Sequence, residues 1–233
     1  MFSEAGVLDL RVDDAPRHLQ SQLSEMGFSV VAAVRPPGLP GSAYIIPNGA
    51  SFYSSSEDMV AIASFVNGGG LAVMLDAEDG EGAAQRSLIA KAMGFQGGWS
   101  LCKSLGSNSH YSYGHPALDT QARSFLPDAV WPAELEDVRV TSVHSRCLHE
   151  DASAVSWPLY TVLDDPDMVV AQAFSRVGAP GAVVWLGYSW KDGPQAEWGA
   201  MLRTLIEAFG TGGHANTPRS PSESPLGTTM RVP

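Results

Sequence analysis

The sequence predicts an α/β fold: a three-layer, mostly parallel sheet with helices on both faces. Two observations predict it. Short apolar runs typical of buried strands alternate with segments whose apolar residues recur at helical spacing. Strand and helix follow each other in steady alternation, which favours a parallel sheet with right-handed crossovers. The clearest strand is Leu71–Leu75, which follows the triple glycine 68–70 and precedes an acidic segment.

The first half of the chain supplies most of this alternation. A helix is expected from Asp13 or Asp14, with Pro16 in its first turn and Gly27 after its last residue. A second helix follows the serines 54–56 and ends at the triple glycine, and a third covers roughly 82–93. The strands expected around these helices lie at residues 7–12, 28–34, 43–46 and 71–75.

The second half is less regular before it returns to strands and a helix. Residues 95–137 are rich in Gly, Ser, Pro and aromatic residues, which favours loops and short elements. Strands are expected at 138–143, 158–163, 169–174 and 182–187, the middle two as a hairpin whose turn covers 164–167. The final helix has apolar residues at i, i+3, i+4, i+7, i+8 and i+11, namely Trp198, Met201, Leu202, Leu205, Ile206 and Phe209.

Two units are expected along the chain: an α/β domain at 1–210 and a flexible tail at 211–233. Gly, Ser, Thr and Pro dominate the tail, which offers almost nothing to bury and so predicts order only on a partner. The formal net charge of −11 disfavours nucleic acid and anionic membranes as partners. The chain shows no signal-peptide pattern and no apolar run of membrane-spanning length, which favours a cytoplasmic, reducing location.

The segments 44–49 and 65–75, together with the late strand and residues 187–190, resemble the class I glutamine amidotransferase-like (flavodoxin-like) superfold over residues 7–210. The similarity is to non-catalytic branches: the amino-terminal domain of an intraflagellar-transport complex B subunit and ThuA-like domains. The nucleophile position reads Leu75-Asp76-Ala77-Glu78-Asp79, without cysteine, and residues 187–192 after the late strand contain no histidine. The resemblance therefore implies no glutaminase activity, because the thiolate and its imidazole partner carry that chemistry.

The first functional hypothesis is a non-catalytic protein-interaction module, a structural subunit of a larger assembly. Protein partners are expected, with the tail 211–233 as a candidate docking segment, and a ciliary complex is the setting that the resemblance implies. Tyr188, Trp190 and Trp198 are the candidate interaction residues. They are most simply core and rim aromatics, and they would form a docking patch only if exposed together. No cofactor is expected.

The competing hypothesis is a hydrolase, with a carbohydrate as one candidate substrate. Asp76, Glu78 and Asp79 follow a buried strand, where acid/base or metal-binding carboxylates are found, and His110 or His115 would complete the site. A solvated acidic loop that caps the next helix is the simpler interpretation. A third hypothesis is a small-ligand binding domain without chemistry.

The histidines and cysteines allow one further site. His144, Cys147 and His149 lie close in sequence, and Cys102, His110 or His115 could complete a zinc site with them. The spacing matches no standard zinc motif, so loop positions beside a short strand are favoured. Whether Cys102 and Cys147 form a single disulfide stays open at the level of sequence.

Overall fold

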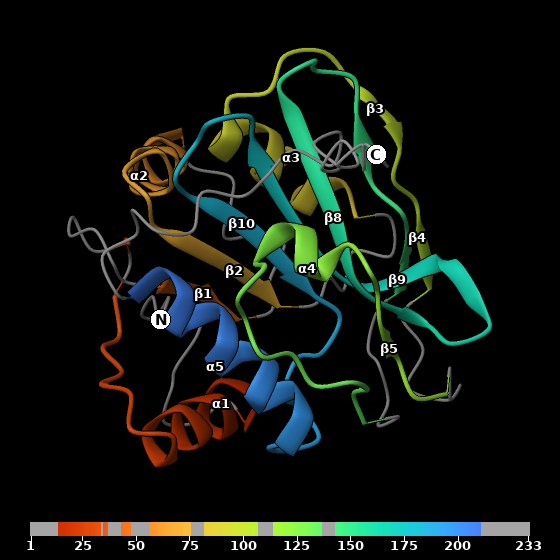
Figure 1. Cartoon of the computed structure of the whole chain (residues 1–233). Helices are drawn as coiled ribbons and strands as arrows, with labels where there is room; N and C mark the ends of the chain where they lie inside the picture. The colour runs from red at the N-terminus through yellow and green to blue at the C-terminus, as the bar shows by residue number, and fades with distance from the viewer. Residues whose placement is uncertain are drawn as a thin grey trace, which may run out of the picture.

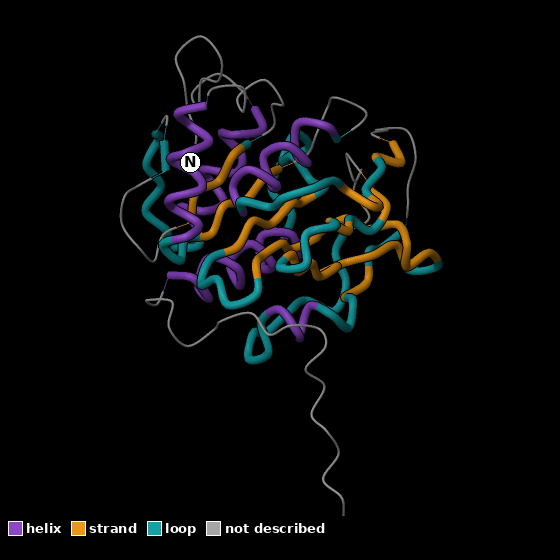
Figure 2. Tube along the Cα trace, turned by 90° about the horizontal axis from the view of Figure 1, so that it is seen from above, coloured by secondary structure: helices purple, strands orange, loops and turns teal. Residues whose placement is uncertain are grey.

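The computed structural model describes residues 14–33, 35–36, 43–47, 56–75, 82–106, 114–136 and 143–210. The predicted strand at 7–12, the acidic loop around Asp76 and Glu78, His110 and the tail 211–233 lie outside these residues. The predicted α/β class is confirmed, because five helices and an eight-stranded mixed sheet are present in the described ranges (Figure 1). Figure 2 shows the strands as a band through the middle of the molecule.

Three strands form the parallel part of the sheet: β1 (Ala43–Ile46), β2 (Leu71–Leu75) and β10 (Ala182–Leu186). β2 lies between the other two and is parallel to both. Every residue of β2 and β10 is buried, which explains their continuous apolar sequences. Because Leu75 pairs with Leu186, the carboxyl ends of β2 and β10 meet at the same edge.

The rest of the sheet is antiparallel. β10 borders β9, which also pairs with β8 and β6, while β6 pairs with β4 and β8 with β5. Two pairings in the sheet are therefore parallel and five antiparallel, so the predicted mostly parallel sheet is not confirmed; the three-layer arrangement stays a prediction. These strands are β4 (Ser104–Gly106), β5 (Ala117–Leu118), β6 (Val143–Ser145), β8 (Ala154–Val162) and β9 (Asp165–Arg176).

The predicted helices are present, and α4 is an additional short one. α1 packs against α5 and α2 against α3, and α4 and α5 lie in front of the strands in Figure 1. Among the described helices, none combines the length and the apolar character that a bilayer-spanning segment needs. Their bounds are α1 (Asp14–Glu25), α2 (Ser56–Asn67), α3 (Ala83–Met93), α4 (Ala122–Phe125) and α5 (Ala196–Gly210).

Two strand predictions need correction. Residues 28–33 form no strand but only an isolated bridge at Ala33. Phe28 and Val30 pack against the core while Val31 is 68% exposed, so this run is only partly buried at the surface of the domain. The hairpin of β8 and β9 is confirmed, yet residues 165–167 belong to β9 and the turn is therefore shorter than predicted. Of the predicted strand at 138–143, the described part begins at Val143, the first residue of β6.

Candidate functional site

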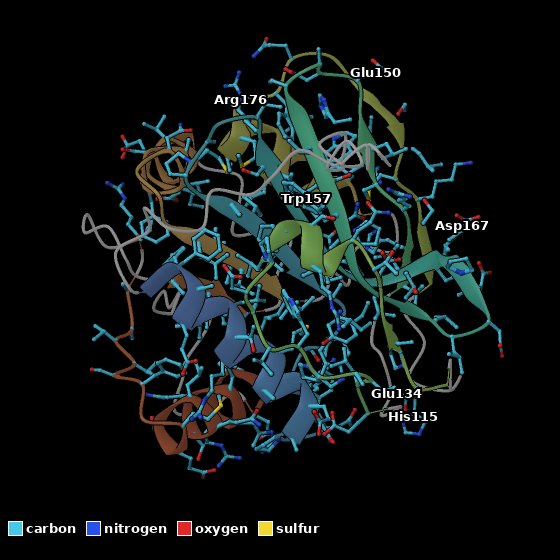
Figure 3. All side chains as sticks on the ribbon, viewed as in Figure 1. His115, Glu134, Glu150, Trp157, Asp167 and Arg176 are labelled. Atoms are coloured by element: carbon cyan, nitrogen blue, oxygen red, sulfur yellow. A yellow bond between two sulfur atoms is a disulfide. The ribbon has the colours of Figure 1, made fainter. Side chains whose placement is uncertain are left out.

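A cavity of about 320 Å³ lies beside the connection between β7 (Leu148–His149) and β8. This volume is near the lower end of the roughly 300–1,000 Å³ typical of small-molecule pockets. β7 pairs with β3 (Trp99–Leu101) to form a two-stranded ribbon. The larger apolar lining residues are Phe95, Leu148, Val155, Phe174 and Val177, and the polar ones are Arg146, His149 and Ser156. Glu150 and Arg176, labelled in Figure 3, are the neighbours in sequence of the lining residues His149 and Val177 and mark the place of the cavity.

Aromatic rings hold His149 in the cavity wall. Its ring centroid lies 4.8 Å from that of Phe95 and 4.9 Å from that of Trp99, which meets it edge-on. His149 Nδ1 accepts a hydrogen bond of 3.0 Å from the Asp151 backbone N–H, so the proton of the neutral ring is on Nε2. Burial lowers the pKa of His149, which keeps the ring neutral at pH 7.

Arg146 is the charged residue of the cavity wall. Its Nη2 donates to Gln121 Oε1 at 2.8 Å, and its backbone N–H donates to the Asp167 carbonyl oxygen at 3.2 Å. Within the described ranges, no carboxylate forms an ion pair with Arg146. A guanidinium stays charged in proteins, and a partly buried charge is costly without a counter-charge. Arg146 is therefore suited to receive an anion.

The acidic residues next to the cavity are engaged elsewhere. Glu150 Oε2 accepts from the Gly98 N–H at 3.1 Å. Asp151 accepts from the Ser153 hydroxyl at 2.6 Å and from the backbone N–H groups of Gln96 and Ser153 at 2.7 and 2.8 Å. These hydrogen bonds lower the pKa of Asp151 to about 2. Both carboxylates thus stabilise the turns around β7 and do not line the cavity.

A disulfide between Cys102 and Cys147 ties the wall of the cavity to the segment between β3 and β4. The two segments also exchange hydrogen bonds of 2.8 Å, from Ser145 N–H to the Lys103 carbonyl and from Lys103 N–H to Ser145 Oγ. Disulfides persist mainly in oxidising compartments. The expected cytoplasmic location therefore stays a prediction.

The catalytic candidates do not form a site within the described part of the chain. Asp76, Glu78, Asp79 and His110 lie outside it. His115 is exposed, with Nδ1 3.2 Å from the Leu135 carbonyl oxygen. Figure 3 shows His115 at the opposite end of the molecule from Glu150 and Arg176, so it cannot contribute to the cavity.

The predicted interaction residues are core residues. Tyr188, Trp190 and Trp198 have no exposed surface, so they form no docking patch. The ring of Tyr188 contacts both tryptophans, with centroid distances of 5.0 and 5.4 Å. Trp190 Nε1 donates to Gln22 Oε1 on α1 at 2.6 Å. The cluster therefore joins α1, the segment after β10 and α5.

Sequence analysis considered residues of the cysteine–histidine cluster and missed the cavity. It considered His144, Cys147 and His149, with Cys102, His110 or His115, as a zinc site but favoured loop positions, and the structure brings the ligand atoms of Cys102, His144 and Cys147 within 4.8 Å of one another. His149 lies apart from this cluster and packs on Phe95. Sequence analysis did not identify Arg146 or the cavity, and no local pattern could have done so, because the lining comes from segments distant in sequence.

No protein-family model matches the sequence, and no similar curated protein is found. Among solved structures, the exo-beta-1,4-mannosidase Op5Man5 from Opitutaceae bacterium strain TAV5 is similar over 83% of this chain, at 13% identity and a TM-score of 0.40. The chain spans 29% of that protein's length. A likeness of this strength assigns neither a family nor a function.

The resemblance to the glutamine amidotransferase-like superfold, including its intraflagellar-transport and ThuA-like branches, is corrected by these findings. No family model of that superfold matches, and the sheet is mixed, with β9 antiparallel beside β10. The short motifs that carried the resemblance, a strand preceded by a triple glycine and a late strand before a helix, occur in many α/β folds. The ciliary setting depended on that resemblance alone and loses its basis.

Proposed function

We propose that this domain is a non-catalytic binding module for a small molecule that has an apolar body and one anionic group. The observation that carries the proposal is the composition of the cavity beside β7. Among its described lining residues, Arg146 is the only charged one, no carboxylate is present, and most of the other residues are apolar.

Each part of such a ligand has a matching surface. Its apolar body would contact Phe95, Val155 and Phe174, and removal of apolar surface from water contributes about 25 cal/mol per Å². Its anionic group would accept hydrogen bonds from the Arg146 guanidinium, which uses one side-chain donor on Gln121. Such charge-assisted hydrogen bonds are stronger than neutral ones.

The hydroxyl of Ser156 argues against covalent chemistry in this cavity. Ser156 Oγ donates to the Cys147 carbonyl oxygen at 2.9 Å instead of to His149. A nucleophilic serine needs a base within hydrogen-bond reach. The described lining therefore contains no nucleophile and base in contact, which supports binding over hydrolysis.

A second candidate function, docking of a protein partner, is favoured by a separate observation. Leu101, Leu105 and Leu148 are 39%, 46% and 38% exposed, and they lie on the short strands β3, β4 and β7. Leu101 and Leu148 pair across the ribbon, and β4 ends the strand order of the main sheet. Partly exposed apolar residues beside an edge strand are typical of a surface that can pair with another chain.

Isothermal titration calorimetry of the protein with hexanoate, and with its neutral counterpart hexanamide, tests the proposal. We expect hexanoate to bind about 10–100-fold more tightly, because hydrogen bonds to a charged group contribute about 1.5–3 kcal/mol. Arg146→Gln should remove this preference. Arg123→Gln, the same change at an exposed position on α4, should keep it. Equal binding of acid and amide to the unaltered protein would refute the proposal.

A further inference from the structure

We infer that Cys102, Cys147 and His144 form a redox-gated metal site, which takes one Zn²⁺ when the disulfide is reduced. The Sγ atoms of the two cysteines and a ring nitrogen of His144 all lie within 4.8 Å of one another. Tetrahedral zinc binds sulfur at about 2.3 Å and imidazole nitrogen at about 2.0–2.1 Å, which separates its ligand atoms by about 3.5–3.8 Å. Small side-chain movements after cleavage of the S–S bond would therefore reach that geometry.

The three ligand residues occupy a buried position. Cys102, His144 and Cys147 are 9%, 3% and 5% exposed. Burial excludes competing water from most of the coordination sphere, and it makes charged thiolates costly unless a cation neutralises them. A soft divalent ion with affinity for sulfur and imidazole suits such a donor set. Three protein ligands leave the fourth zinc position for water or another small ligand.

Residues around the ligands hold them in place. The His144 ring meets Trp185 edge-on, with centroids 4.3 Å apart. Gln172 binds the backbone of Cys147 from both sides: its Oε1 accepts from the N–H at 3.0 Å and its Nε2 donates to the carbonyl at 2.9 Å. Arg86 Nη1 donates to the Cys102 carbonyl oxygen at 2.9 Å. Such supporting contacts orient ligands in metal sites.

The conversion between the disulfide form and the reduced, zinc-bound form follows from thiol chemistry. A dithiol reductant transfers two electrons and two protons to the Cys102–Cys147 bond, and becomes a disulfide itself. The S–S bond breaks and two thiols form. Zn²⁺ then replaces both thiol protons, which are released to solvent, and His144 binds through a neutral ring nitrogen. In the reverse direction, a disulfide oxidant takes two electrons from the two thiolates and two protons from solvent and becomes a dithiol, while the Cys102–Cys147 bond forms again and Zn²⁺ is released.

Cobalt provides a direct test on the full chain. The protein is reduced with a phosphine, which adds no thiol ligand, and is titrated with Co²⁺ and then with Zn²⁺. We expect one Co²⁺ per chain, with thiolate-to-cobalt charge-transfer bands and the intense visible bands of a tetrahedral site, and displacement by one Zn²⁺. The oxidised protein should show none of these bands.

Variants distinguish a metal site that includes His144 from non-specific binding of metal to the two thiols. His144→Ala should weaken Zn²⁺ binding at least tenfold and shift the visible cobalt bands, whereas His115→Ala, an exposed control, should change neither. If reduction unfolds the chain, recovery of its circular dichroism on addition of one equivalent of Zn²⁺ supports the site, and failure to recover overturns it. Absence of stoichiometric metal on the reduced, folded chain, or identical cobalt spectra for wild type and His144→Ala, would also overturn it.

Discussion

Single residues in this protein are held by partners that lie far away in the sequence. Gln22 on α1 is the clearest case, because its Oε1 accepts from Trp190 Nε1 and its Nε2 donates to the Gln195 carbonyl, both at 2.6 Å. Gln22 is 9% exposed and Trp190 is fully buried. One amide therefore satisfies a buried donor and a carbonyl acceptor, both in the segment between β10 and α5. Trp190 also has a φ of 65°, an unusual value for a residue with a side chain.

We expect Gln22→Leu to lower the free energy of unfolding by about 1–3 kcal/mol, because it leaves the Trp190 N–H and the Gln195 carbonyl without this partner. Gln20→Leu is the matched control on the same helix, where Gln20 is half-buried, and it should change stability by less than about 0.5 kcal/mol. Urea unfolding of both variants measures the difference. Equal effects of the two changes would contradict the assigned role of Gln22.

The hydrogen bonds to Asp151 predict an acid-dependent contribution to stability. The pKa of Asp151 is about 2 in the folded protein against an ordinary value of 3.8, because the Ser153 hydroxyl and two backbone N–H groups stabilise the carboxylate. A lowered folded-state pKa stabilises the fold above about pH 4, and this contribution disappears as the pH falls through 2.

We therefore expect Ser153→Ala to raise the pKa of Asp151 toward 3.8, as followed by NMR titration of its carboxyl carbon. The stability difference between wild type and Asp151→Asn should shrink between about pH 4 and about pH 2. A difference that stays constant over this interval would show that the carboxylate charge is not the source of the effect.

At the scale of elements, the packing of β10 against the end of α2 depends on a residue without a side chain. Gly181 precedes β10, and a Cβ there would overlap the carbonyl oxygens of Val66 and Gly70. Both are backbone atoms, which cannot rotate away as a side chain would. The Gly181 carbonyl oxygen also accepts from Ser175 Oγ at 2.8 Å, which links the ends of β9 and β10.

Gly181→Ala should destabilise the fold by more than about 2 kcal/mol, since the overlap forces the parallel strands apart from α2. Gly68→Ala tests the same region with less crowding, because its Cβ would lie 3.3 Å from the nearest carbonyl oxygen. Thermal unfolding should show a much smaller loss for this control. A Gly181→Ala variant as stable as wild type would contradict the close packing described above.

For the molecule as a whole, the disulfide joins two parts of the chain that are distant in sequence and lie side by side in the sheet, because β4 pairs with β6. Cys102 precedes β4, and Cys147 follows β6, with a sequence separation of 45 residues. The bridge closes a loop that contains β4, β5, α4 and β6. Its main thermodynamic effect is expected on the unfolded state, whose conformational freedom it restricts.

Reduction should lower the free energy of unfolding by up to about 4 kcal/mol at 25 °C, the loop-entropy value for a closure of this length. Urea unfolding with and without a phosphine reductant measures this loss. If the metal site proposed above is correct, one equivalent of Zn²⁺ added to the reduced protein should restore part of the lost stability. No change on reduction would show that the bridge adds no constraint to the unfolded chain.

Local sequence patterns by themselves determined the α/β class, most helices and the buried strands. α1, α3 and α5 could be predicted because apolar periodicity, capping residues and terminal glycines act within a few residues of each other; Gly27, for example, follows α1 with a φ of 90°. Continuous apolar runs likewise predicted β2 and β10, since parallel strands are buried on both faces.

Only the tertiary structure decided the strand order and the sites. The direction of β9 beside β10 depends on contacts between segments, so alternation alone misjudged the sheet as mostly parallel. Burial of Tyr188 and Trp190 depends on α1 and α5, which no local pattern places beside them. Sequence proximity grouped His144 with both Cys147 and His149, but chain geometry sends His149 to the cavity wall and brings Cys102 to His144 instead.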